Sequence, residues 1–75
     1  MNYCVDVQEL RKAMIDANLM TVISLAEASG VDRNTIGSIL NEKTKPSAAV
    51  IEKIAAALSL DGERIGRIFF SSILA

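Results

Sequence analysis

The stretch that decides the fold is "LAEASGVDRNTIGSILNEKTKPS", residues 25–47. Gly30 divides it into two parts, because glycine tolerates the left-handed backbone with which a chain leaves one helix sharply. Thr21 is a suitable N-cap for a first short helix over residues 22–29. A second short helix is predicted over residues 33–41. The stretch is therefore interpreted as a helix, a tight turn, a second helix and a basic loop.

The second of these helices is predicted to have two different faces. Asp32 suits its N-cap, and Val31, directly after the turn, is predicted to enter the core. Apolar side chains at helical spacing form a compact inward edge. They are Ile36, Ile39 and Leu40. At about 100° per residue, a polar and nearly uncharged set points the opposite way. It consists of Asn34, Ser38 and Asn41.

The remainder of the chain predicts three more helices. They cover about residues 7–18, 48–59 and 62–74. Each follows a side chain that suits an N-cap: Asp6, Ser47 and Asp61. Short polar connections separate them, and no segment shows the pattern of a strand. The sequence therefore predicts a single domain over residues 1–75, with five helices.

The composition limits the kinds of protein that this chain can be. With 75 residues, 51% of them hydrophobic and a formal net charge of -1, it suits one small core and excludes a disordered tail. Cys4 is the only cysteine and histidine is absent, which excludes a disulfide within the chain and argues against a structural zinc site. The apolar end "IFFSSILA" is much shorter than the roughly 20 residues of a membrane helix. We expect a cytoplasmic protein without membrane segment, metal or cofactor.

Catalysis is not expected either. The sequence has no histidine, no nucleophile with a plausible base, no glycine-rich phosphate loop and no close pair of carboxylates. We therefore predict that the protein is not an enzyme.

Two helices joined by a glycine-bearing turn, here about residues 22–41, form a helix-turn-helix, whose second helix can enter the major groove of DNA. The longer stretch "LAEASGVDRNTIGSILNEKTKPSAAVIEKIAAAL" resembles the helix-turn-helix domains of the lambda-repressor and Cro, or Xre, type. The residues that carry the resemblance are Leu25, Ala26, Gly30, Val31, Ile36, Ile39, Lys43, Lys45, Pro46 and Ser47. The resemblance implies an all-α, compact five-helix bundle that binds DNA, often as a dimer on a two-fold operator.

Carried onto matching positions, the resemblance also implies two sets of DNA contacts. Those facing base edges would be Arg33, Asn34 and Ser38. Those facing phosphates would be Thr21 at the start of the first helix of the motif, Asn41, Lys43, Thr44 and Lys45. The side-chain chemistry agrees, because Arg bonds guanine bidentately, Asn pairs with adenine, and Ser bonds either. Lysines add sequence-independent affinity by releasing counterions, although the alternative for these two is a solvated loop.

Several residues depart from the family pattern. Val22 stands where the family often has a glutamine that bonds a phosphate, and an aliphatic side chain cannot make that bond; the alternative is that Val22 packs inward beside Ala26. Gly37 lies inside the second helix of the motif, at a cost of about 1 kcal/mol relative to alanine. Residues 32–45 carry three basic and two acidic side chains. Electrostatics therefore permits DNA binding without demanding it.

The last predicted helix, residues 62–74, has more apolar surface than one core can use. At about 100° per residue, Phe70 and Leu74 fall about 140° and 180° from Ile65. Exposed apolar surface of this kind marks an interface, although a frayed end is the alternative. We assign to a dimer or partner surface the residues Val22, Ile23, Phe70, Ile73 and Leu74.

These observations lead to two functional hypotheses. The first is a small sequence-specific DNA-binding transcriptional regulator, Cro-like or Xre-like, of a phage, prophage or mobile element, acting as a homodimer on a double-stranded DNA operator. The alternative is a helix-turn-helix protein that acts by binding another protein, such as a modulator or antirepressor docking on a phage repressor.

Overall fold

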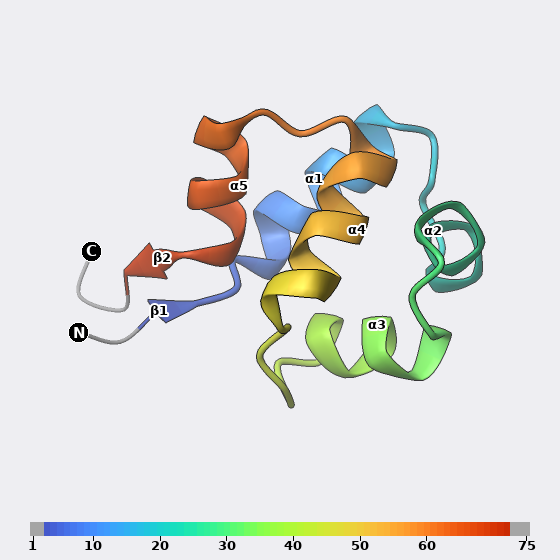
Figure 1. The fold of residues 1–75 in the computed structure, drawn as a ribbon, viewed down its shortest axis with the longest axis horizontal. Helices are drawn as coiled ribbons and strands as arrows, with labels where there is room; N and C mark the ends of the chain where they lie inside the picture. Colours follow the sequence, from blue (N-terminus) through green and yellow to red (C-terminus); the bar gives the residue numbers. More distant parts are fainter. Residues whose placement is uncertain (1–2, 73–75) are drawn as a thin grey trace.

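The computed structural model describes residues 3–72, which form five helices and a small two-stranded ribbon (Figure 1). The helices are α1 (Val7–Asp16), α2 (Val22–Ser29), α3 (Arg33–Leu40), α4 (Ala48–Leu58) and α5 (Gly62–Phe69). The strands are β1 (Tyr3–Cys4) and β2 (Ser71–Ser72). The predicted five-helix, all-α bundle is confirmed, and the ribbon is an addition that the sequence did not suggest.

Side-chain caps fix where four of the helices begin. Each cap oxygen accepts a hydrogen bond from the backbone N–H three residues later, at 2.8 to 3.2 Å. These caps are the predicted residues Asp6, Thr21, Ser47 and Asp61. Asp32 also occupies an N-cap position, at the start of α3, but its side chain makes no capping hydrogen bond. The sequence therefore predicted the N-cap position of Asp32 correctly, whereas the capping hydrogen bond expected of its side chain is not formed.

Left-handed residues fix where the first two helices end. Gly30 follows α2 with φ 76°, and its N–H donates to the carbonyl of Ala26 at 2.9 Å, as the glycine in the turn predicts. Helix α1 ends at Asp16, two residues before the predicted end, because Ala17 is its C-cap and Asn18 adopts φ 58°. Asparagine tolerates this conformation better than most residues.

The core lies between the helices, with α2 packed on α3 and α4, and α5 packed on α1 and α4. The apolar edge predicted for α3 is confirmed, since Ile36 and Ile39 are each 1% exposed and Leu40 is buried. Val31 is buried directly after the turn, again as predicted. Burial of this edge holds α3 in one orientation, and its opposite face is left for solvent or a partner.

The ribbon lies beside α5, on the side of the molecule opposite α2 (Figure 1). Its strands are antiparallel, with Cys4 opposite Ser71, and the N–H of Asp6 donates to the carbonyl of Ile68 at 2.7 Å. The predicted helix over residues 62–74 is therefore too long. It ends at Phe69, because the chain beyond it pairs with β1.

Candidate nucleic-acid interface

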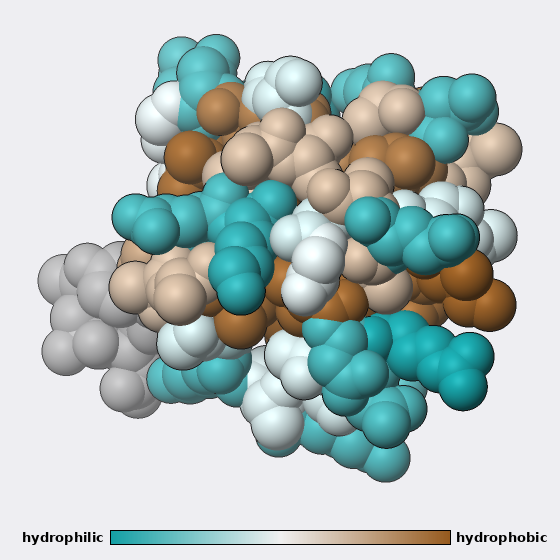
Figure 2. Space-filling model, turned by 45° about the vertical axis from the view of Figure 1, so that its right-hand side comes forward, coloured by the Kyte–Doolittle hydropathy of each residue, from teal (hydrophilic) through white to brown (hydrophobic). Residues whose placement is uncertain are grey.

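Helix α3 presents a polar outer face at the bottom of the molecule. Arg33 and Asn34 are exposed on its first turn, and Ser38 is half-buried one turn later. Figure 2 shows hydrophilic side chains gathered at this end. Because the opposite edge of α3 is fixed in the core, these side chains leave the surface from a rigid base. The structure thus brings together the three residues predicted to face base edges.

A shallow groove separates α3 from the start of α4. Its walls carry the hydroxyl groups of Thr35, Ser38, Thr44 and Ser47, together with Asn34 and Lys45. Hydroxyl and ammonium groups suit the oxygen atoms of a nucleic-acid backbone. The sequence reasoning missed Thr35 and Ser47 as members of this surface. The signal for Thr35 was its place one residue after Asn34 on the same exposed turn, whereas Ser47 was recognised only as a cap.

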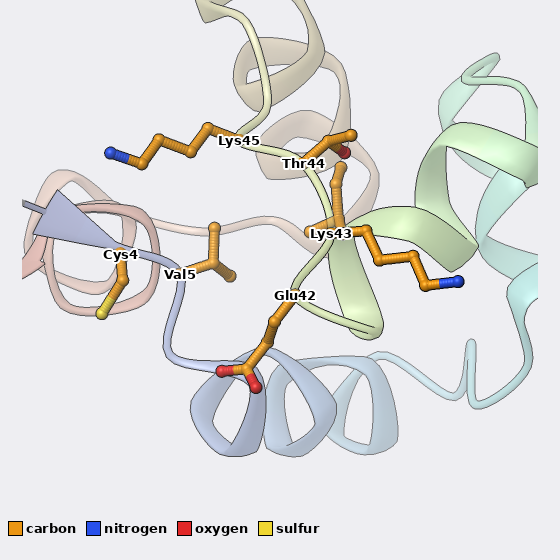
Figure 3. A pocket seen from close by; sticks show the side chains of 7 residues that line it. Cys4, Val5, Glu42, Lys43, Thr44 and Lys45 are labelled. Atoms are coloured by element: carbon orange, nitrogen blue, oxygen red, sulfur yellow. The ribbon is translucent and has the colours of Figure 1, made fainter.

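The loop after α3 leaves the helix through a strained residue. Glu42 has φ 59°, its N–H donates to the carbonyl of Ile39 at 3.0 Å, and that of Lys43 donates to the carbonyl of Ser38 at 2.9 Å. The predicted phosphate contacts Asn41, Lys43, Thr44 and Lys45 are all exposed. Figure 3 shows the side chains of Lys43 and Lys45 pointing in opposite directions. The two lysines are therefore placed to meet separate charges.

The start of α2 differs from the polar surface of α3. The Thr21 hydroxyl accepts a hydrogen bond from the Ser24 N–H at 3.0 Å and bonds the Ser24 hydroxyl at 2.6 Å, so both hydroxyls are engaged within the helix. Val22 is half-buried and packs against the core, which supports the inward alternative for this residue. Ile23 is 56% exposed. What α2 offers a phosphate is the backbone N–H groups of Val22 and Ile23, because that of Ser24 donates to Thr21.

The residues predicted for a dimer or partner surface fall into three groups. Ile23 and Phe70 are exposed, Phe70 at 50%. Val22 packs largely inward. Ile73 and Leu74 lie outside the described residues. The sequence reasoning missed two other exposed apolar residues, Ile15 and Met20, each 60% exposed. Ile15 could have been found, because it lies about 140° from Leu10 around the helix.

A family model described as Helix-turn-helix matches residues 9–65, which include all of α2, α3 and the loop between α3 and α4. The chain belongs to the helix-turn-helix family. It is of the lambda-repressor, or Xre, type, as the sequence resemblance indicated. No curated protein and no solved structure matched the chain. The family is one of DNA-binding regulators and is not typically enzymatic.

Two further findings concern the described part of the chain. Within residues 3–72, no helix combines the length and apolar content that crossing a bilayer requires. The same residues bring together no group of three or more His, Cys, Asp or Glu side chains that could hold a metal ion.

Proposed function

We propose that this helix-turn-helix protein is a small sequence-specific transcriptional regulator, Cro-like or Xre-like, of a phage, prophage or mobile element. The observation that carries the proposal is the two-sided α3. Its inner edge, Ile36 and Ile39, is 1% exposed, while Arg33 and Asn34 on the other side are open to a ligand. A helix held this way is suited to the major groove, where base edges carry distinct patterns of donors and acceptors.

In this proposal each polar group around α3 has a separate task. Arg33 bonds O6 and N7 of a guanine, and Asn34 bonds N6 and N7 of an adenine. Lys43 and Lys45 neutralise phosphates on the two sides of their loop, and the hydroxyl groups of the groove fix the register without reading sequence. A homodimer would place two copies of α3 about one helical turn apart, on the two halves of a symmetric operator.

The test is a titration of labelled DNA from the region upstream of the coding sequence, by fluorescence anisotropy at several salt concentrations. Binding should weaken steeply with salt, and Lys43→Gln should reduce the slope of log K against log salt by about 0.9. The matched control is Lys53→Gln, which removes an exposed charge from α4 and should leave the slope unchanged. Absence of binding even at low salt would overturn the proposal.

A second candidate function is favoured by the apolar surface beside α3. Ile23, 56% exposed on the first turn of α2, lies on the element that packs against α3, and Figure 2 shows hydrophobic side chains at the height of α2, above the polar end. In this alternative the protein docks on another regulator, such as a phage repressor. It predicts a complex with that regulator that Ile23→Asp abolishes, and no affinity for DNA alone.

A further inference from the structure

The groove between α3 and the start of α4 has an apolar part, in addition to its hydroxyl and ammonium groups. Pro46, at the end of the loop, and Val50, on the first turn of α4, line the groove together with the polar residues. Both are half-buried, so each keeps part of its surface open to solvent. Asn34 and Ser38 of α3 line the same groove. An apolar surface therefore adjoins side chains that were predicted to face base edges.

The fold accounts for only part of this apolar surface. Val50 and the next residue, Ile51, both pack partly against the core. A hydrophobic residue before an N-cap commonly packs on the fourth residue of the helix, which for the N-cap Ser47 is Ile51 and not Val50. The contact that Pro46 makes within the start of α4 is therefore expected to be with Ile51, and it does not require Val50.

Pro46 and Val50 are also unsuited to a phosphate. Proline has no backbone N–H group, and the N–H of Val50 already donates to the Ser47 hydroxyl at 3.2 Å. What the two residues offer a ligand is apolar contact. A partner for this part of the groove must therefore carry an apolar group.

The remaining groups of the groove suit the other parts of a nucleotide in duplex DNA. The hydroxyl groups of Thr44 and Ser47 and the ammonium group of Lys45 suit a phosphate. None of the described residues that line the groove is acidic, and the ion pairs within residues 3–72 do not include Lys45. The charge of the groove is therefore complementary to a nucleic-acid strand, and its apolar part is left for a base.

Thymine is the base that this apolar part fits. In the major groove thymine alone presents a methyl group, whereas the other bases present hydrogen-bond donors and acceptors. Asn34 and Ser38 are one helical turn, or about 5.4 Å, apart, and neighbouring base pairs are about 3.4 Å apart, so more than one base pair can face this stretch of α3. We propose that Pro46 and Val50 receive the C5-methyl group of a thymine, which makes Val50 a further determinant of the sequence preference. This contact rests on the proposed function, because α3 must lie in the major groove for it to form.

The test replaces the thymines of the preferred DNA site, one at a time, by deoxyuridine, which pairs like thymidine and lacks only the C5-methyl group. The affinity of the wild-type protein for each site is measured by fluorescence anisotropy. At one or more positions the substitution should weaken binding about fourfold, as expected for the loss of one buried methyl group. A preferred site without thymine, or equal affinity for all the substituted sites, would overturn the proposal.

The variant Val50→Ala locates the methyl contact. It should lose the fourfold preference for thymine over deoxyuridine, whereas Val7→Ala, which truncates another half-buried valine, on α1 and outside the groove, should keep it. Each preference is a ratio of two affinities of the same variant, so a general loss of stability does not change it. A preference that persists in Val50→Ala would overturn the role of Val50. If the protein binds no DNA even at low salt, the proposed function fails and this contact with it, whereas DNA binding that is insensitive to deoxyuridine overturns this contact alone.

Discussion

Helices α2 and α3 pack on each other in one motif, yet the outer face of α3 and the first turn of α2 differ in their chemistry. On α3 the exposed side chains are Arg33 and Asn34, and the apolar ones are turned into the core. On α2 the hydroxyls of Thr21 and Ser24 bond each other, and Ile23 is the exposed side chain. The difference is the reason why the proposed function assigns sequence reading to α3 alone, with α2 as a support whose first turn carries no charged side chain.

The largest expected effect is the loss of stability when the buried edge of α3 is truncated. Ile39→Ala removes a side chain that is 1% exposed and should lower the free energy of unfolding by about 2 to 5 kcal/mol, because it leaves a cavity in a small core. Chemical denaturation followed by circular dichroism measures it. Asn34→Ala, on the outer face of the same helix, should change stability by less than about 0.5 kcal/mol. Similar losses in both variants would contradict the two-sided description of α3.

The next effect concerns base reading. Arg33→Ala should cost about 1 to 3 kcal/mol in binding to the preferred DNA sequence and should relax the preference at one base pair. Competition titrations with single-base operator variants measure both quantities. Lys43→Ala is the comparison, because loss of a phosphate contact weakens binding to all sequences alike. A uniform loss for Arg33→Ala would remove Arg33 from the reading face.

A smaller effect separates the two glycines of the motif. Gly37, inside α3, has nothing within 4 Å of the position that a Cβ would occupy, so Gly37→Ala should stabilise the fold by about 0.5 to 1 kcal/mol. Gly30 has equal space but φ 76°, and Gly30→Ala should destabilise by about 1 kcal/mol. Thermal unfolding of the two variants compares them directly. If both substitutions changed the stability in the same direction, the turn would not require a left-handed residue at position 30.

The smallest effect concerns the first turn of α2 and the salt dependence of DNA binding. Ile23→Lys places a positive charge on the first turn of α2 and should increase the salt dependence of DNA binding by about 0.9 in slope, with little effect on stability. Anisotropy titrations over a range of salt concentrations measure this slope. If Ile23 instead belongs to a protein-binding surface, neither protein will bind DNA alone, and the substitution will abolish the complex with a partner.

Local signals account for the parts of the fold that the sequence predicted well. Thr21 and Gly30 bound α2 at its observed ends, because a cap and a left-handed glycine act within one turn of chain. The ribbon was not predictable in this way, since Cys4 and Ser71 are 67 residues apart and two-residue strands carry no periodicity. The pairing of these distant residues is also why α5 ends at Phe69.

The candidate site also has a part that local sequence signals predict and a part that depends on the tertiary structure. Helical spacing alone placed Asn34 outside and Ile36 inside. The inward packing of Val22 depends on neighbouring helices, and the opposite directions of Lys43 and Lys45 depend on how the backbone leaves α3 through Glu42 at φ 59°. Neither is encoded in the spacing of residues, so both required the structure.

The central claim, that the outer face of α3 reads base sequence, is tested most directly by selection of binding sites from random duplex DNA. Wild-type protein and the Arg33→Gln variant are selected in parallel, and the enriched sequences are compared. The account predicts one enriched motif for the wild type and a changed preference at a single position for the variant, because glutamine favours adenine where arginine favours guanine. The same motif for both proteins, or no enrichment by the wild type, would contradict it.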